Sequence, residues 1–242
     1  MIVPLQISQI ADFLELSAPD KKNHVAIVGG GGKTTILHAL GEQLHGRTIL
    51  TCTTKMGFDQ NKFLPIYLKP DDETIGNISI GNPVMVWEEI EGQKAIGVDP
   101  SMCDRWFTIV DNVIVEADGS RRLPFKAPAE FEPVIPSSST LVISTIGADS
   151  LDQVISDCCH RPNLVADLAG CMPYDRLTAE RASRVILHSE GHKKAKPPNA
   201  DFCVAITKVD NGNQHKVEVL SNLICSSDQN AKVMVIAFES AD

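Results

Sequence analysis

A short apolar run that leads into four glycines, one lysine and two threonines constrains the fold of this chain more than any other feature. Residues 24–28 have the length and the apolar content of a buried strand, and the glycines begin directly after them. Residues 33–44 then place their apolar side chains on one helical face. A strand, a glycine-rich loop and a helix in this order predict a unit of a parallel α/β sheet with a ligand site at the loop.

The chemistry of this loop points to phosphate. Glycines let backbone N–H groups converge on phosphate oxygens, and the helix that follows presents its positive end to the same anion. The lysine would stabilise charge on the terminal phosphates, and the next hydroxyl would complete the coordination of magnesium. A flexible glycine turn is the alternative interpretation. The predicted nucleotide-binding residues of the loop are Gly29, Gly30, Gly31, Gly32, Lys33, Thr34 and Thr35, with Lys33 also catalytic and Thr34 also a metal ligand.

The loop is shorter than the common phosphate-binding motif, in which the first glycine lies further from the lysine. The common spacing would place a glycine at position 27, which is Ile27. The shorter form resembles the loop of the ATP-dependent Mur-type ligases. It keeps open an alternative function, that of an ATP-dependent ligase or kinase-like transferase acting on a small molecule.

Apolar runs of the same style recur along the chain and alternate with helical patterns. Further strands are predicted at residues 48–51, 112–116, 141–145, 202–206 and 232–237, and helices at residues 6–16, 100–109, 178–188 and 214–225. Residues 63–98 differ, because runs at 84–87 and 94–98 flank Glu91-Gly92 as the arms of a β-hairpin would. The pattern predicts a single domain over residues 1–242. Its expected fold is a P-loop NTPase-like three-layer αβα arrangement with a mostly parallel sheet and a β-hairpin insertion at about residues 63–98.

Charge and cysteine content restrict the partners and the compartment. The 31 acidic and 22 basic residues give a formal net charge of −9, which argues against a nucleic-acid binder because phosphate backbones attract a surplus of Lys and Arg. The seven cysteines are an odd number and show no periodic spacing, unlike those of a secreted disulfide scaffold. This pattern indicates reduced thiols in a cytosolic protein. The sequence shows neither a basic leader nor an apolar run of about 18 residues. We therefore expect a soluble cytoplasmic protein with no membrane partner.

Carboxylates follow the strand predicted at residues 112–116, at the sheet edge where ligands of open α/β sheets gather. Glu116 ends this strand, and Asp118 follows beside a glycine. Enzymes with a phosphate loop need a carboxylate there to hold magnesium. We expect Asp118 to be the metal ligand and a catalytic residue, with Glu116 as the second metal candidate, although an Asp-Gly turn would show the same pattern. Lys55, after the strand at residues 48–51, is the third catalytic candidate, and a solvated lysine is its alternative interpretation.

The strand at residues 202–206 is followed by Thr207, Lys208, Val209 and Asp210, which match an element by which many GTPases read guanine. A carboxylate there would accept hydrogen bonds from the guanine ring N–H and amino group, a donor pair that adenine lacks. We therefore predict that Thr207, Lys208 and Asp210 bind the base, and that the cofactors are Mg²⁺ with GTP or ATP, GTP being preferred. A small backbone contact to the base is predicted at residues 239–241.

Several of these motifs together resemble the YqeC family. The likeness rests on the glycine loop, on Thr53-Thr54-Lys55-Met56, on Glu116-Ala117-Asp118-Gly119-Ser120, on Lys126-Ala127-Pro128, on Glu132-Pro133-Val134-Ile135-Pro136, on His160-Arg161-Pro162 and on Thr207-Lys208-Val209-Asp210. It covers about residues 24–237, and residues 116–136 are its most specific part. Members are described as accessory proteins of selenium-dependent molybdenum hydroxylases. The resemblance therefore implies such a hydroxylase, or the proteins that mature its cofactor, as a partner.

Charged residues cluster after the predicted magnesium carboxylate, in a segment stiffened by prolines. We expect this segment and the later His-Arg-Pro motif to bind a second substrate or a client protein, and a solvated connection is the alternative. The predicted substrate or partner residues are Arg121, Lys126, Glu132, His160 and Arg161. The leading hypothesis is a nucleoside triphosphatase that couples nucleotide binding or hydrolysis to maturation of a molybdenum enzyme. A module that binds nucleotide only to order a partner surface is a third hypothesis.

Overall fold

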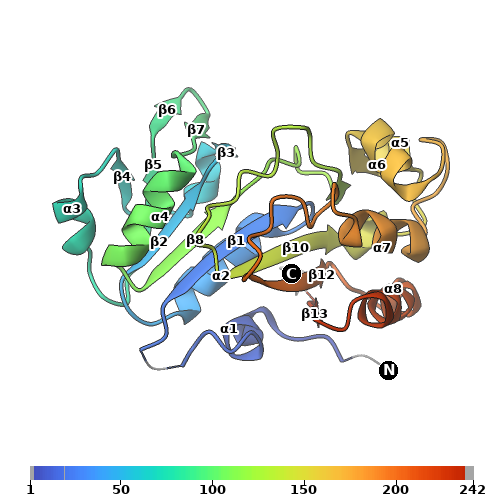
Figure 1. The fold of residues 1–242 in the computed structure, drawn as a ribbon, viewed down its shortest axis with the longest axis horizontal. Coiled ribbons are helices and arrows are strands. Elements are labelled where there is room, and N and C mark those ends of the chain that lie inside the picture. Colours follow the sequence, from blue (N-terminus) through green and yellow to red (C-terminus); the bar gives the residue numbers. More distant parts are fainter. Residues whose placement is uncertain (1–2, 19, 238–242) are drawn as a thin grey trace.

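The computed structural model describes residues 3–18 and 20–237, so the base contact predicted at residues 239–241 lies outside the described residues. An eight-stranded sheet runs through the molecule, and every neighbouring pair of its strands is parallel (Figure 1). In spatial order its strands are β13 (Ala231–Val235), β12 (Asp201–Thr207), β10 (Leu141–Gly147), β1 (Asn23–Gly29), β8 (Asn112–Glu116), β2 (Thr48–Cys52), β5 (Val84–Trp87) and β4 (Ile66–Leu68). The central strands are buried along their whole length, as expected for a parallel sheet covered on both faces.

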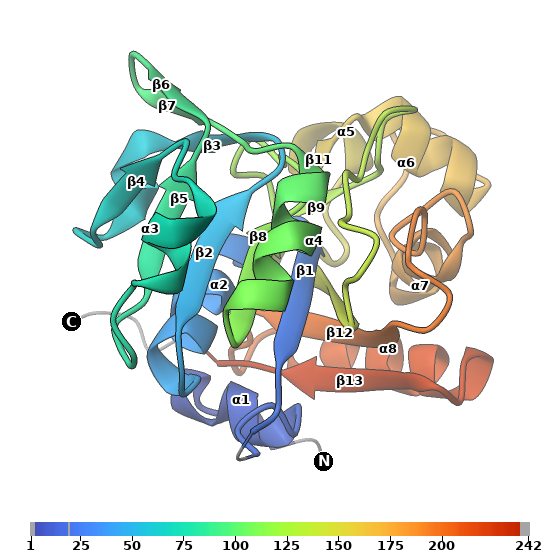
Figure 2. The ribbon, with the colours of Figure 1, turned by 60° about the vertical axis from the view of Figure 1, so that its left-hand side comes forward.

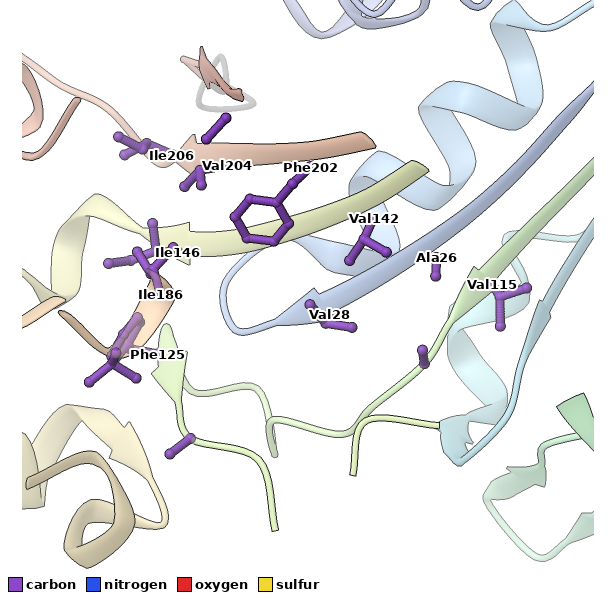
Figure 3. Packing of buried hydrophobic residues seen from close by; sticks show 14 of the residues in the cluster. Ala26, Val28, Val115, Phe125, Val142, Ile146, Ile186, Phe202, Val204 and Ile206 are labelled. Carbon is purple, nitrogen blue, oxygen red and sulfur yellow. The ribbon is translucent and has the colours of Figure 1, made fainter. Parts of the chain in front are cut away.

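Helices cover both faces of this sheet and so make three layers (Figure 2). On one face lie α1 (Ile10–Phe13) and α2 (Lys33–Gln43); the cluster on the other face includes α3 (Asp72–Gly76), α4 (Pro100–Ile109), α5 (Ile155–Cys158), α6 (Pro162–Ala169), α7 (Ala179–Leu187) and α8 (Gln214–Ser227). Short 3₁₀-helices are η1 (Ile7–Gln9), η2 (Phe58–Asn61) and η3 (Ala148–Ser150). Successive residues of a strand point to opposite faces of the sheet. Val25 and Ile27 of β1 pack with α2 on one face, whereas Ala26 and Val28 belong to the hydrophobic cluster on the other face (Figure 3). The predicted three-layer αβα fold with a parallel sheet is confirmed.

A small antiparallel sheet lies at the carboxyl end of β2. Its strands are β3 (Lys55–Gly57), β7 (Lys94–Ile96) and β6 (Glu89–Glu91), and β6 and β7 form a hairpin that projects from the molecule (Figure 2). The run at residues 84–87, predicted as one arm of a hairpin, instead forms β5 and pairs in parallel with β2. Every residue of β5 is buried, so both of its faces suit the interior of the main sheet, whereas β6 is exposed at both ends. That the whole chain is one domain remains a prediction.

A two-stranded parallel sheet joins β9 (Phe125–Lys126) to β11 (Cys159–His160). It places the Lys-Ala-Pro motif beside the His-Arg-Pro motif, although the two are far apart in the sequence. Among the helices of the part of the chain that the structure describes, none is long and apolar enough to cross a bilayer.

Candidate functional site

The predicted phosphate loop connects β1 to α2 at the carboxyl edge of the main sheet. Gly29, Gly31 and Gly32 have φ angles of 96°, 77° and 98°, which glycine tolerates and other residues avoid. A Cβ atom on Gly29 would lie 2.4 Å from the Thr145 carbonyl oxygen, and one on Gly31 would lie 2.6 Å from the Gly147 amide nitrogen. The loop therefore requires glycine both for its backbone angles and for its close approach to β10.

Lys33 and Thr34 open α2, and their side chains meet the carboxyl end of β8. The Lys33 ammonium donates to the Gly29 carbonyl oxygen at 2.7 Å and lies 3.3 Å from Asp118 Oδ1 and 3.7 Å from Glu116 Oε1. The Thr34 hydroxyl donates to Glu116 Oε2 at 2.8 Å. Burial raises the pKa of Glu116, and Lys33 and Thr34 oppose this effect by favouring the charged carboxylate. A hydroxyl and a carboxylate held side by side form a donor pair that suits Mg²⁺.

Asp118, which we expected to be the first metal ligand, occupies a different position. Its Oδ2 accepts a hydrogen bond from the Gly29 amide at 3.0 Å and lies 3.0 Å from the Lys126 ammonium. Its side chain is buried and does not line the cavity beside Thr34, whereas that of Glu116 does. The geometry thus favours Glu116 for the metal and gives Asp118 the task of holding the start of the loop in place.

Lys126 is the centre of a buried group of charges behind the loop. Its ammonium donates to the Gly119 carbonyl oxygen at 2.7 Å and to Glu132 Oε2 at 2.5 Å, in addition to its contact with Asp118. Arg161 completes the group by donating to both oxygens of Glu132, at 2.6 and 3.1 Å. Burial alone would raise the pKa of Glu132, but the hydrogen bonds from Arg161 and Lys126 lower it to about 2.

This placement differs from the expected contact with a second substrate or client. Lys126 is fully buried and Glu132 is nearly so. Both charges are tolerated in the interior because they form an ion pair with each other. His160 is half-buried in the strand that pairs with β9, and burial together with Arg161 lowers its pKa to about 4. These residues therefore brace the segment after β8 against the loop, and of the predicted group only Arg121 lines the cavity.

His192 lies directly behind the loop and was not predicted from the sequence. Its Nε2 is 2.8 Å from the Lys126 carbonyl oxygen and its Nδ1 is 2.7 Å from the Ser144 hydroxyl, so a neutral ring with the proton on Nε2 satisfies both partners. Its Cε1 would lie 3.2 Å from a Cβ atom on Gly29. The polar loop that carries His192 gave no sign of this role, because the contact depends on tertiary packing.

Replacing His192 with glutamine is expected to reduce the loss of stability in acid. Burial lowers the pKa of His192 from 6.5 to about 4, so below pH 6.5 the unfolded chain binds a proton that the folded protein does not. Its contribution to the free energy of unfolding is therefore fully present above pH 6.5 and is lost as the pH falls toward 4. Urea unfolding at about pH 7.5 and about pH 5 should show a drop about 2 kcal/mol smaller in His192→Gln than in the wild type. The exposed His188 provides the control, His188→Gln, and equal drops in both variants would contradict this role.

A cavity of about 250 Å³ opens in front of Lys33 and Thr34. Six basic side chains line it, against the single carboxylate of Glu116, in a chain whose net charge is −9. Such a concentration of positive charge marks a site for anions. The six are Lys33, Lys55, Lys94, Arg121, Arg122 and Lys208.

Of these six, Lys94 was not predicted, and Arg122 was expected only as a member of the charged segment after the magnesium carboxylate. Arg122 follows Arg121 directly, and its place among the charges after the Asp-Gly turn was the signal that put it in this segment. Lys94 gave no such signal, because it reaches the cavity only through the pairing of β7 with β3, in which Lys94 lies opposite Gly57.

The predicted base-binding residues lie in different surroundings. Thr207 is buried and its hydroxyl donates to the Gly31 carbonyl oxygen at 2.8 Å, so it supports the loop from behind. Lys208 lines the cavity and forms an ion pair with Asp149 at 2.8 Å. Asp210 is exposed, lies outside the residues that line the cavity, and accepts from the amides of Gly212 and Asn213 through Oδ1. These contacts hold the turn before α8.

An eight-stranded parallel sheet, covered on both faces and joined to a helix by a glycine loop at its carboxyl edge, defines the class of P-loop NTPase-like αβα folds. Within this class the chain belongs to the YqeC family, whose description reads "YqeC protein" and which matches residues 25–163. The "Uncharacterized protein YqeC" of Escherichia coli (strain K12) is 32% identical over 193 residues, which cover 76% of this chain and 75% of that protein. The crystal structure of hydrogenase maturation factor HypB from Archaeoglobus fulgidus is similar with a TM-score of 0.40 and 14% identity, over 96% of this chain and 87% of that chain.

Proposed function

We propose that this protein binds a magnesium nucleotide, with GTP preferred over ATP, and hydrolyses it in the cytoplasm as an accessory protein of a selenium-dependent molybdenum hydroxylase. The observation that carries nucleotide binding is the group formed by Lys33, Thr34 and Glu116 at the inner end of a cavity lined by basic side chains. Loop amides, an ammonium and a hydroxyl–carboxylate pair are the groups by which a protein holds a triphosphate.

The residues have distinct tasks in this proposal. Gly31, Gly32 and Thr35 line the cavity and bring backbone N–H groups to the phosphates, Lys33 stabilises their charge, and Thr34 with Glu116 holds the metal. The amides of Gly29 and Gly30, which were predicted to join them, donate instead to Asp118 and to the Thr145 carbonyl oxygen and so shape the loop. Magnesium supplies neutralisation of the terminal phosphates when it is bound. Asp118 orients Gly29, and Lys55 faces the terminal phosphate from β3. Such positioning and electrostatic stabilisation account for most of the catalysis in phosphoryl transfer.

The alternative function, a ligase or kinase-like transferase that uses ATP, is favoured by one observation. Basic residues continue along the outer wall of the cavity, beyond the inner group of Lys33, Thr34 and Glu116. A protein that only hydrolyses its nucleotide has no need for them, whereas a transferase must hold a second substrate there.

Base preference is tested by calorimetric titration of GTP and ATP, each with and without Mg²⁺. We expect GTP to bind about tenfold more tightly than ATP, because Asp210 would accept from both guanine donors. Asp210→Asn should bring the two affinities within about threefold of each other, since an amide cannot accept twice as a carboxylate does. Asp201 at the opposite end of β12 gives the control, Asp201→Asn, which should leave the preference unchanged. A preference for ATP, or a GTP-to-ATP ratio unaltered by Asp210→Asn, would sink the guanine assignment.

The hydroxylase partner rests on the family resemblance alone. It is tested by measuring hydroxylase activity in cells that lack this protein, with a gene encoding Lys33→Ala as the complementation control. Normal hydroxylase activity without the protein would exclude this partner and leave nucleotide binding untouched.

A further inference from the structure

The outer wall of the cavity carries basic residues in addition to those proposed to hold the nucleotide. Lys33 and the loop amides lie at the inner end, where magnesium would neutralise part of the phosphate charge. Lys94, Arg121 and Arg122 line the outer part together with Lys55, which also faces the terminal phosphate in the proposal, and with Lys208, which is paired with Asp149. The only carboxylate among the described residues that line the cavity is that of Glu116, at the inner end. A second anion would balance this charge.

Lys55, Lys94, Arg121 and Arg122 come from two separate parts of the fold that line the same cavity. Lys55 and Lys94 lie on the small antiparallel sheet, and Arg121 and Arg122 lie on the segment after β8. Arg122 reaches across to Asp59 of η2 in an exposed ion pair of 2.9 Å, and Lys55 pairs with Glu91 at 3.2 Å in another. Exposed pairs of this kind contribute little to stability, so both cations can exchange their partners for a ligand. Lys94 and Arg121 form no ion pair within the part of the chain that the structure describes.

The backbone conformation of Arg121 and Arg122 also indicates a ligand site on the outer wall. Arg121 and Arg122 have φ angles of 53° and 64°, in the left-handed region that residues other than glycine rarely adopt. Two such residues in succession are energetically costly, and costs of this kind concentrate at ligand-binding sites. This conformation lets two consecutive guanidinium groups line the same cavity.

We infer that the outer wall of the cavity binds a second ligand, a small molecule that carries a phosphate group, next to the terminal phosphate of the nucleotide. Phosphate fits because a tetrahedral dianion accepts hydrogen bonds from several directions, as several cations from two separate parts of the fold require, whereas a planar carboxylate is satisfied by one guanidinium. A small molecule fits because the nucleotide phosphates would share a cavity of only about 250 Å³, which is already smaller than typical ligand sites of roughly 300–1,000 Å³. The position of this ligand beside a nucleotide rests on the proposed function, and its binding to the outer wall does not.

The test uses inorganic phosphate as the probe in two calorimetric titrations of the full chain. The first titrates wild-type protein saturated with Mg²⁺ and a non-hydrolysable GTP analogue, and the second titrates Lys33→Ala without nucleotide. We expect phosphate to bind in both and Lys94→Gln/Arg122→Gln to weaken it at least about tenfold in both, while nucleotide affinity changes less than about threefold. The matched control is Lys69→Gln/Arg105→Gln, which removes one exposed lysine and one exposed arginine from ion pairs outside the cavity. Acetate should bind at least about tenfold more weakly than phosphate.

Three results would overturn the inference: no phosphate binding in either titration, equal binding of acetate, or a loss of nucleotide affinity in Lys94→Gln/Arg122→Gln as large as the loss of phosphate affinity. The last would assign these cations to the nucleotide itself. Failure of the wild type to bind any nucleotide, together with phosphate binding to Lys33→Ala that depends on Lys94 and Arg122, would refute the proposed function and support the second site.

Discussion

Replacement of Lys33 with alanine is expected to lower the affinity for magnesium nucleotide by about 100-fold, which corresponds to about 3 kcal/mol. The Lys33 ammonium is buried at the inner end of the cavity, where charge-assisted hydrogen bonds to phosphate gain strength from the exclusion of water. The substitution also leaves Glu116 with one cation fewer. Because burial already raises the pKa of Glu116, this carboxylate can take up a proton instead of remaining an unpaired charge.

The fold should therefore survive this substitution with a loss of about 1–2 kcal/mol in the free energy of unfolding. Calorimetric titration measures the affinity, and circular dichroism with urea unfolding verifies the structure. Lys216→Ala is the matched control, since Lys216 lies on α8 in an ion pair with Asp152, outside the residues that line the cavity. If Lys33→Ala bound magnesium nucleotide with wild-type affinity, the loop could not be the phosphate-binding loop.

Replacement of Lys126 with methionine is expected to cause the largest loss of stability, about 3–5 kcal/mol. Methionine fills a similar volume, but it removes the cation 3.0 Å from Asp118 Oδ2 and leaves the Gly119 carbonyl oxygen without a donor. Asp118 then keeps only Lys33, 3.3 Å from its Oδ1, as a nearby cation. Glu132 keeps Arg161, so the cost falls mainly on Asp118 and on the segment that follows β8. Urea unfolding at neutral pH measures the change.

A matched control and a rescue make this prediction specific. Lys232→Met removes an exposed ion pair with Glu15 and should change the free energy of unfolding by less than about 0.5 kcal/mol. Adding Asp118→Asn to Lys126→Met should recover part of the loss, because the neutral amide no longer needs a cation. A loss below about 1 kcal/mol in Lys126→Met would show that the buried charges are not mutually dependent.

Local patterns were sufficient to predict most of the main sheet. β8 and α4 begin and end at the predicted residues, since each has a clear apolar period and a turn on either side. β5 was predicted as part of a hairpin, because its sequence does not reveal that its partner is β2, far earlier in the chain. α5 and α6 were not predicted, because they are short and follow a stretch without a regular apolar period.

In the candidate site, too, local sequence patterns predicted some features, whereas long-range contacts could not be predicted. The glycine loop could be recognised because its residues are contiguous. The choice between Glu116 and Asp118 could have been improved by strand alternation: Glu116 lies beside Ile27 in the register of β8 with β1, and Ile27 packs on the face that carries α2. Nothing local to Lys126 predicts that it is fully buried, because β11, which pairs with β9, and Arg161, which shares Glu132 with Lys126, both come from later in the chain.

The central position of β1 has a consequence for how the protein is made. β1 lies between β8 and β10, so residue 25 pairs with residues 114 and 141, and the loop after it packs against Thr145 and Gly147. During synthesis from the N-terminus, the chain must therefore emerge beyond Gly147 before the loop has its walls. Until then the glycine loop has no scaffold, and a nascent chain halted earlier lacks the geometry that we propose for phosphate binding.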